Sequence, residues 1–208
     1  MNIPSKFTCV IALFAFIAVN GCSNESAPPS PLVTKIEQER REKDRHFKHN
    51  NDSPLPEATK EQFSGLRYFP VDLKYRFEGP IAKFAQPETL AFATSDGRLK
   101  KALRYGLFSF SLEGQPQQLE IYRLLTLSAQ YADYLFIPFI DLTSGEETYG
   151  GGRYLDLVEQ KDNHYVIDFN LAYNPSCAYG RKDFSCPIPP SSNHLRVSIR
   201  AGEKKWKD

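Results

Sequence analysis

The chain has 208 residues with 26 basic and 25 acidic side chains, which gives a formal net charge of +1. This balance argues against a nucleic-acid partner, which requires a basic footprint, and against an electrostatic membrane-binding patch. About 150 residues follow the N-terminal segments, and a chain of that size can bury one sizeable core, so we expect a single folded domain.

The first 22 residues have the pattern of a signal peptide that ends at a cysteine. Lys6 gives a short positive region, and residues 7–19 form an uncharged apolar run that is shorter than the roughly 20 residues needed to span a bilayer. Gly21 then precedes Cys22, and this order resembles the lipobox of bacterial lipoproteins, whose cysteine carries the lipid. The resemblance predicts cleavage before Cys22 and a membrane anchor on it. An ordinary signal peptide and an uncleaved anchor are the alternatives.

The residue after the cysteine bears on the destination of the protein. Lipoproteins that Gram-negative bacteria retain in the inner membrane usually carry Asp there, whereas this chain has Ser23. The resemblance therefore predicts an exported lipoprotein of the outer membrane that faces the periplasm of a Gram-negative bacterium.

Two polar segments separate the cysteine from the folded part. Residues 23–34 are rich in Ser and Pro, which is typical of a semi-extended tether. Residues 35–49 are strongly charged, and Ile36 and Phe47 are too sparse to form a strong apolar stripe, so we expect a solvated helix that docks loosely. The expected division is a signal peptide at 1–21, a lipidated cysteine with tether and charged helical segment at 22–52, and one β domain at 53–208.

From Tyr68 onward the hydrophobic pattern predicts short strands. Residues 69–77 alternate apolar and polar side chains, as in a half-buried strand. Residues 134–140 form a continuous apolar run, as in a strand buried on both faces, although Pro138 implies an edge or a bulge. Further strands are expected near residues 90–92, 99–105, 108–112, 119–125, 153–158, 165–170 and 195–200. The expected fold is all-β and mainly antiparallel, a barrel-like or sandwich single domain with short N-terminal helices, and a β-barrel is one form of it.

Several long stretches of the domain are similar to a known family. They are residues 63–72, 134–141, 143–156, 168–175, 177–179, 186–190 and 201–203, with Asn193. Together they resemble the bacterial domain-of-unknown-function family 1684 over about residues 53–204. Some members look like lipoproteins and others lack a signal. The family has no established activity, so the resemblance implies membership but no reaction.

The candidate site comes from a predicted hairpin between residues 153–158 and 165–170. If the apolar residues of both strands face the core, the register places Asp156 directly opposite Asp168, beside Asn170. Two facing carboxylates repel, so a shared proton, a basic partner, a bound cation or solvent must offset them. Such pairs can do acid–base work. The alternative is a solvated face, or aspartates that accept loop N–H groups.

The loop before this hairpin adds further candidates. The glycines at 150–152 and the guanidinium of Arg153 could meet an anion, although the loop matches neither a Walker A nor a dinucleotide-binding motif. The alternative is a turn that needs positive φ angles. The candidate ligand-binding residues are Glu147, Tyr149, Arg153, Asp156, Asp168, Asn170, Tyr173 and Asn174.

Cleavage before Cys22 would remove Cys9 and leave two cysteines besides Cys22. In an oxidising periplasm Cys177 and Cys186 would form a disulfide worth roughly 2–3 kcal/mol. A metal site with His194 would have the spacing C-x8-C-x7-H, which is no common zinc motif. A nucleophilic cysteine would need a placed histidine, and none is evident. We therefore expect no metal and no cofactor.

The leading functional hypothesis is a lipid-anchored domain that binds a small polar ligand through this carboxylate, Asn and Tyr cluster. One alternative is a hydrolase-type enzyme that uses Asp156 and Asp168 as acid and base. Another is an envelope factor that recognises a protein partner.

Overall fold

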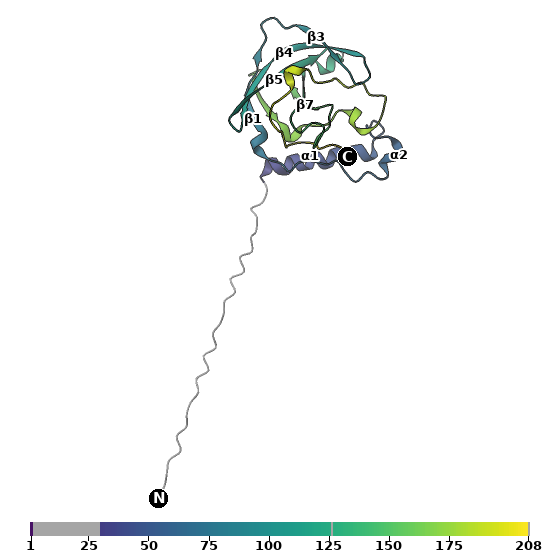
Figure 1. Ribbon diagram of the computed structural model, residues 1–208, viewed down its shortest axis with the longest axis vertical. Coiled ribbons are helices and arrows are strands. Elements are labelled where there is room, and N and C mark those ends of the chain that lie inside the picture. The colour runs from purple at the N-terminus through teal and green to yellow at the C-terminus, as the bar shows by residue number, and fades with distance from the viewer. Residues whose placement is uncertain (2–29, 126, 208) are drawn as a thin grey trace.

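The computed structural model describes residues 1, 30–125 and 127–207 (Figure 1). Residues 2–29, which include Cys22, most of the predicted signal peptide and the first part of the predicted tether, lie outside this range, whereas residues 31–34 of that tether belong to the first helix. The α-helices are α1 (Pro31–His49) and α2 (Glu57–Lys60), and the 3-10 helices are η1 (Leu73–Tyr75), η2 (Ala129–Tyr131), η3 (Phe169–Leu171), η4 (Ser176–Tyr179) and η5 (Ser191–Asn193). The strands are β1 (Arg76–Pro80), β2 (Ala82–Lys83), β3 (Thr89–Ala93), β4 (Leu99–Leu112), β5 (Gln115–Leu124), β6 (Tyr134–Phe139), β7 (Arg153–Val158) and β8 (His164–Asp168).

The strands form two antiparallel sheets that do not close into a barrel. The larger has the order β2-β4-β5-β6-β7, with β3 also paired to β4, and the smaller consists of β1 and β8. The prediction of a mainly antiparallel single domain is confirmed, and its form is sandwich-like. Figure 1 shows α1 lying along one end of the strands.

The two faces of the β6–β7 pair belong to different apolar clusters. Leu135 and Leu155 point into the main core, while Phe136 and Tyr154 belong to a second, aromatic cluster. This follows from the alternation of side chains along a strand. Asp156 comes two residues after Tyr154 and therefore lies on the aromatic side.

Two predicted strands are absent from the described structure. Residues 69–77 do not form one strand, because Asp72 accepts a hydrogen bond from the Lys74 amide (3.0 Å) and starts η1, so that β1 begins only at Arg76. Residues 195–200 form no strand either, although Leu195 donates to the Ile140 carbonyl at 2.8 Å. Both segments alternate apolar and polar residues, but local capping and isolated bridges replace a continuous ladder.

The sequence predicted that Pro138 lies either in an edge strand or at a bulge, and the edge strand is wrong. Strand β6 pairs with β5 on one side and with β7 on the other. Asn193 from η5 compensates for the amide that proline lacks: its Nδ2 donates to the carbonyls of Glu120 and Pro138, both at 2.8 Å, and its Oδ1 accepts from the Glu120 amide at 2.7 Å. The inserted amide side chain satisfies backbone groups that the ladder leaves open.

Helix α1 docks more closely than the sequence predicts. Ser30 caps its first turn, and one face, at helical spacing, carries Ile36 and Phe47, which are buried. Between them, Arg40, Lys43 and Asp44 bind the domain by hydrogen bonds. These polar contacts hold α1 against the domain, whereas its two apolar residues alone predicted only loose docking. No helix in the described ranges is long and apolar enough to cross a membrane.

Candidate functional site

The predicted hairpin between β7 and β8 does not exist. Strand β7 pairs with β6, which sets Asp156 beside Phe136, and β8 pairs with β1, which sets Asp168 beside Arg76. The chain returns to β7 only at Tyr173, through a bridge with Tyr154. The predicted core face was correct, since Leu155, Ile167 and Phe169 all lie in the main core. The register was wrong because β8 finds its partner in a distant strand.

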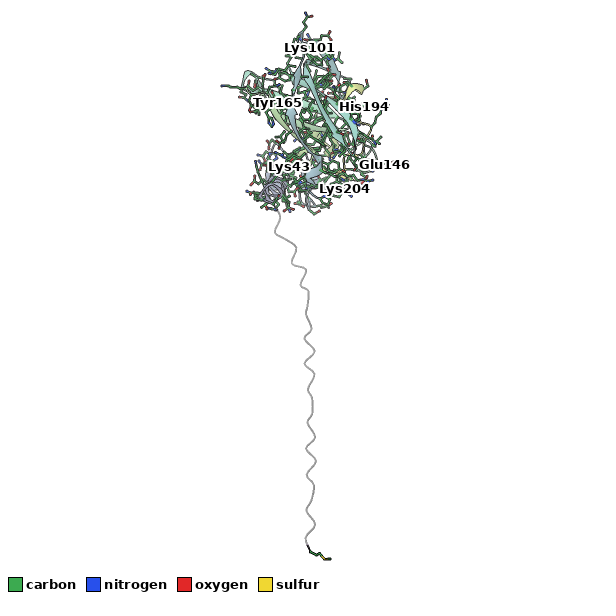
Figure 2. All side chains as sticks on the ribbon, turned by 90° about the vertical axis from the view of Figure 1, so that its left-hand side faces the viewer. Lys43, Lys101, Glu146, Tyr165, His194 and Lys204 are labelled. Atoms are coloured by element: carbon green, nitrogen blue, oxygen red, sulfur yellow. A yellow bond between two sulfur atoms is a disulfide. The ribbon has the colours of Figure 1, made fainter. Side chains whose placement is uncertain are left out.

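A cavity of about 310 Å³ lies where β7 and β8 separate. We call it the α1 cavity, because residues of α1 form part of its lining. Figure 2 views α1 end-on, with Lys43 on the side of the helix that faces the strands. The lining residues are Ile36, Glu39, Arg40, Lys43, Tyr68, Leu155, Asp156, Leu157, Val166, Ile167, Asp168, Asn170, Leu171, Ala172, Tyr173 and Glu203.

Asp156 is the centre of a hydrogen-bonded cluster at this cavity. The hydroxyl of Tyr134 donates to its Oδ1 at 2.5 Å, and the hydroxyl of Tyr173 lies 2.8 and 2.9 Å from its two oxygens. Tyr134 pairs with Val158, so it is a diagonal neighbour of Asp156 on the same face, within reach of a long side chain. The Tyr154–Tyr173 bridge places the second phenol.

The surroundings change the ionisation of this cluster. Partial burial raises the pKa of Asp156, although the two phenol donors and the positive charge of Lys43 oppose the rise. Burial and the nearby carboxylate raise the pKa of Tyr134 and of Tyr173, which therefore stay protonated and donate. Asp156 itself keeps contact with solvent, so the rise in its pKa is moderated by water.

Asp168 also lines this cavity, but its carboxylate holds the local backbone in place. Its Oδ1 accepts from the backbone amide of Asn170 at 2.9 Å and from the Asn170 side chain at 2.8 Å, which caps η3. Arg76 lies 3.8 Å from its Oδ2. Asn170 is engaged in turn by the backbone of Asp72, through two bonds of 2.9 Å. The pair Asp168 and Asn170 therefore shapes the cavity wall.

Glu203 is a buried lining residue that the sequence analysis missed. Lys43 of α1 donates to its Oε1, while the hydroxyl of Tyr179 and the amide of Asn174 (2.9 Å) donate to its Oε2. Asn174, a predicted site residue, is thereby part of the support of Glu203 and does not line the cavity. The signal available in the sequence was the similarity of residues 201–203 to the family.

The remaining missed residues come from α1 and from the segment before β1. Arg40 donates to the carbonyls of Phe69 (2.9 Å) and Asn170 (3.0 Å), and its guanidinium lies 4.5 Å from the ring centre of Tyr68. The spacing of Ile36, Arg40 and Lys43 is that of one helix face, and it could have identified this wall.

The predicted anion-binding loop lies elsewhere and is structural. Arg153 is fully buried, where it donates to Asp141 at 2.7 Å and to the carbonyl of Ile199 at 2.8 Å. Gly152 has φ +84°, and a Cβ there would lie 2.5 Å from the Phe139 carbonyl. The alternative of a turn that needs a positive φ angle therefore holds for this glycine. Glu147 pairs with Arg200 and Tyr149 lines a separate hollow near the C-terminus, so neither reaches the α1 cavity.

Cys177 and Cys186 are joined by a disulfide. The hydroxyl of Ser95 lies 3.1 Å from the Cys177 sulfur and accepts from the Cys186 amide, also at 3.1 Å. The disulfide joins η4 to the segment that follows it, and the contacts of Ser95 hold both to the turn after β3. Neither sulfur lines the α1 cavity, so the disulfide has a structural role.

The geometry can be compared with known proteins. A family described as "Protein of unknown function (DUF1684)" matches residues 61–204. The chain belongs to this family. The matched residues include β7, β8 and the segment that follows them, while α1 precedes the match.

One solved structure is similar to this DUF1684 member along most of both chains. It is the solution NMR structure of the uncharacterised protein from gene locus rrnAC0354 of Haloarcula marismortui, with 39% identity and a TM-score of 0.63. The match covers 82% of this chain and 92% of the other. No curated protein matches the chain significantly.

Proposed function

We propose that this DUF1684 member binds a small polar ligand in the α1 cavity, with Asp156 as the main polar contact. The observation that carries the proposal is the setting of this carboxylate. It is oriented by two phenols at the wall of a cavity of about 310 Å³, and no basic side chain of the described residues lies within 4 Å of it. Cavities near this size hold small molecules, and a few placed polar groups fix their orientation.

The hydrolase-type alternative has less support. An acid–base pair requires a second titratable group free to exchange a proton. One carboxylate oxygen of Asp168 accepts the hydrogen bonds that cap η3, and Arg76 lies beside the other oxygen. Binding is therefore the function favoured by the arrangement.

The proposal includes an anchor at Cys22, which would hold the domain in the periplasm, at the outer membrane. The chain from Cys22 to Pro31, where α1 begins, spans at most about 30 Å even when extended. An anchored domain would therefore keep the α1 cavity close to the bilayer.

A thermal-shift screen of polar metabolites on the full-length chain tests the binding proposal. We expect at least one compound to raise the melting temperature of the wild type but not of Asp156→Asn. Glu146→Gln is the matched control, because it removes one carboxylate from an exposed loop that Figure 2 shows on the other side of the domain from Lys43. A compound that stabilises the wild type and Asp156→Asn equally would refute the role of Asp156.

Intact-mass measurement of the membrane fraction tests the anchor. The expected mass is that of a chain starting at Cys22 with added acyl groups, and Cys22→Ala should move the protein out of that fraction. An unmodified chain that begins at Met1, or one cleaved elsewhere, would contradict the anchor and leave the binding proposal intact.

A further inference from the structure

We propose that the ligand of the α1 cavity is a small organic cation, a primary amine with one apolar arm. This inference rests on the binding function proposed above and narrows it to a chemical class. It follows from the charges, the rings and the hydrogen bonds that line the cavity.

The lining carries more acidic than basic groups. Its carboxylates are Glu39, Asp156, Asp168 and Glu203, and its basic side chains are Arg40 and Lys43. Glu203 is neutralised by Lys43, and Asp168 has Arg76 at 3.8 Å. A carboxylate in partly desolvated surroundings gains most from a cationic partner.

Both basic groups of the lining are already engaged. Arg40 gives its two terminal nitrogens to backbone carbonyls, and Lys43 is paired with Glu203. Of the donors of these two groups, the Arg40 Nε is buried without a hydrogen-bond partner among the described residues, but an anionic ligand that approached it would also face Asp156. The charge distribution thus disfavours a carboxylate or phosphate ligand.

The aromatic rings of the cavity already accommodate cations of the chain itself. The ammonium of Lys43 lies 4.9 Å from the ring centre of Tyr173, and the guanidinium of Arg40 lies 4.5 Å from that of Tyr68. Such cation–π contacts are attractive because the ring face is negative. Because Lys43 and Arg40 already occupy these ring faces, the group left to hold a ligand ammonium is the carboxylate of Asp156.

Asp156 retains the capacity to accept another donor. Its Oδ1 receives both phenols, whereas its Oδ2 receives only Tyr173, and a carboxylate has about four lone-pair sites. Since both phenols donate, the additional partner must be a donor as well. An ammonium group supplies the donor and the missing positive charge together.

The apolar part of the lining and the size define the rest of the ligand. Leu157, Val166 and Leu171 line the cavity together with Asp156. A volume of about 310 Å³ is at the small end of ligand pockets. One short aliphatic or aryl arm fits this description, which is why we propose a simple amine.

Isothermal titration of the full-length chain with three matched compounds tests the inference. They are 2-phenylethylamine, 2-phenylethanol and 3-phenylpropionate, which share one arm and differ in charge. We expect the amine to bind at least about tenfold more tightly than the alcohol, as charge-assisted hydrogen bonds do, and the acid to bind least. Asp156→Asn should remove this preference, while Glu146→Gln should keep it.

Each result decides between distinct conclusions. If the alcohol or the acid binds as tightly as the amine and Asp156→Asn weakens it, the cation inference is overturned and the binding proposal stands. If none of the three compounds binds, the cation inference is overturned, and if in addition no metabolite stabilises the protein, the binding proposal is overturned as well. Should Asp156→Asn fail to fold, the order of the three compounds on the wild type still decides the ligand class.

Discussion

The hydroxyl of Tyr173 lies 2.8 and 2.9 Å from the two carboxylate oxygens of Asp156. Tyr173 reaches this position because its backbone bridges Tyr154, with N···O distances of 2.8 and 3.0 Å. The contact joins the edge of β7 to the segment after η3, and it stands at the α1 cavity. It shows how two sheets that do not close can still enclose a ligand-sized space.

Asp156→Asn should stabilise the protein at neutral pH. The pKa of Asp156 is raised in the folded state, so this state binds more protons than the unfolded chain between the ordinary and the raised value. Stability therefore falls as pH rises through that window, and the amide removes the loss. We expect a melting temperature up to about 3 °C higher at pH 7, and no difference near pH 3, below the ordinary carboxylate pKa of about 3.9.

The control for this prediction is Asp183→Asn. Arg181 lowers the pKa of Asp183, so its neutralisation should leave the melting temperature unchanged or lower it slightly. A melting temperature of Asp156→Asn that lies below the wild type at pH 7 and recovers at low pH would contradict the sign of the Asp156 shift.

Arg153→Met should destabilise the fold strongly. The change leaves Asp141 charged and fully buried, together with carbonyls that Arg153 now satisfies. Breaking a buried pair in this way costs about 3–5 kcal/mol, measured as the free energy of unfolding in denaturant. Arg200→Met, which breaks the exposed pair with Glu147, should cost at most about 1 kcal/mol. Equal losses for the two variants would refute the structural role of Arg153.

Asn193→Ala should cost about 3 kcal/mol or more, because it leaves buried backbone groups of Glu120 and Pro138 without partners. Denaturant unfolding measures this loss. Gln118→Ala provides the comparison, since its side chain bonds only to Ser109 on the exposed surface and should change stability by under about 0.5 kcal/mol. A loss at Asn193 no larger than that at Gln118 would show that β5 and β6 do not depend on the inserted amide.

Reduction of the Cys177–Cys186 disulfide should lower stability by roughly 2–3 kcal/mol, as expected for a loop of this length. The measurement is chemical unfolding with and without reductant, accompanied by thiol counting. The double variant Cys177→Ala/Cys186→Ala should be insensitive to reductant. Two free thiols in the native protein, or an unchanged midpoint after reduction, would contradict the prediction.

The fold was predictable where local signals and burial agree. The apolar run at 134–140 became β6, and the predicted strand at 153–158 became β7. The local sequence signals failed to predict strand pairing where the partner strand lies far away in the sequence. Residues 165–168 pair with β1, far away in the sequence, and nothing in their own pattern distinguishes that partner from the nearby β7.

Part of the site was predictable, because several of its residues lie close together in the sequence. Asp156, Asp168, Asn170 and Tyr173 all line the α1 cavity, although their predicted register was wrong. Asp168, Asn170 and Tyr173 belong to one continuous segment, so they lie at the same cavity although the predicted strand pairing was wrong. Arg153 was assigned to a ligand because a glycine-flanked guanidinium has the same pattern whether it meets an anion or a buried Asp141.

The most direct test of the account is an NMR titration of the full-length chain with the compound that stabilises it most in the thermal-shift screen. Binding in the α1 cavity predicts amide shift changes concentrated in residues 36–43, 155–157 and 166–173, and their loss in Asp156→Asn. Shift changes that centre on another surface, such as the hollow beside Tyr149 and Trp206, or that persist in Asp156→Asn, would contradict the assignment of the α1 cavity as the binding site.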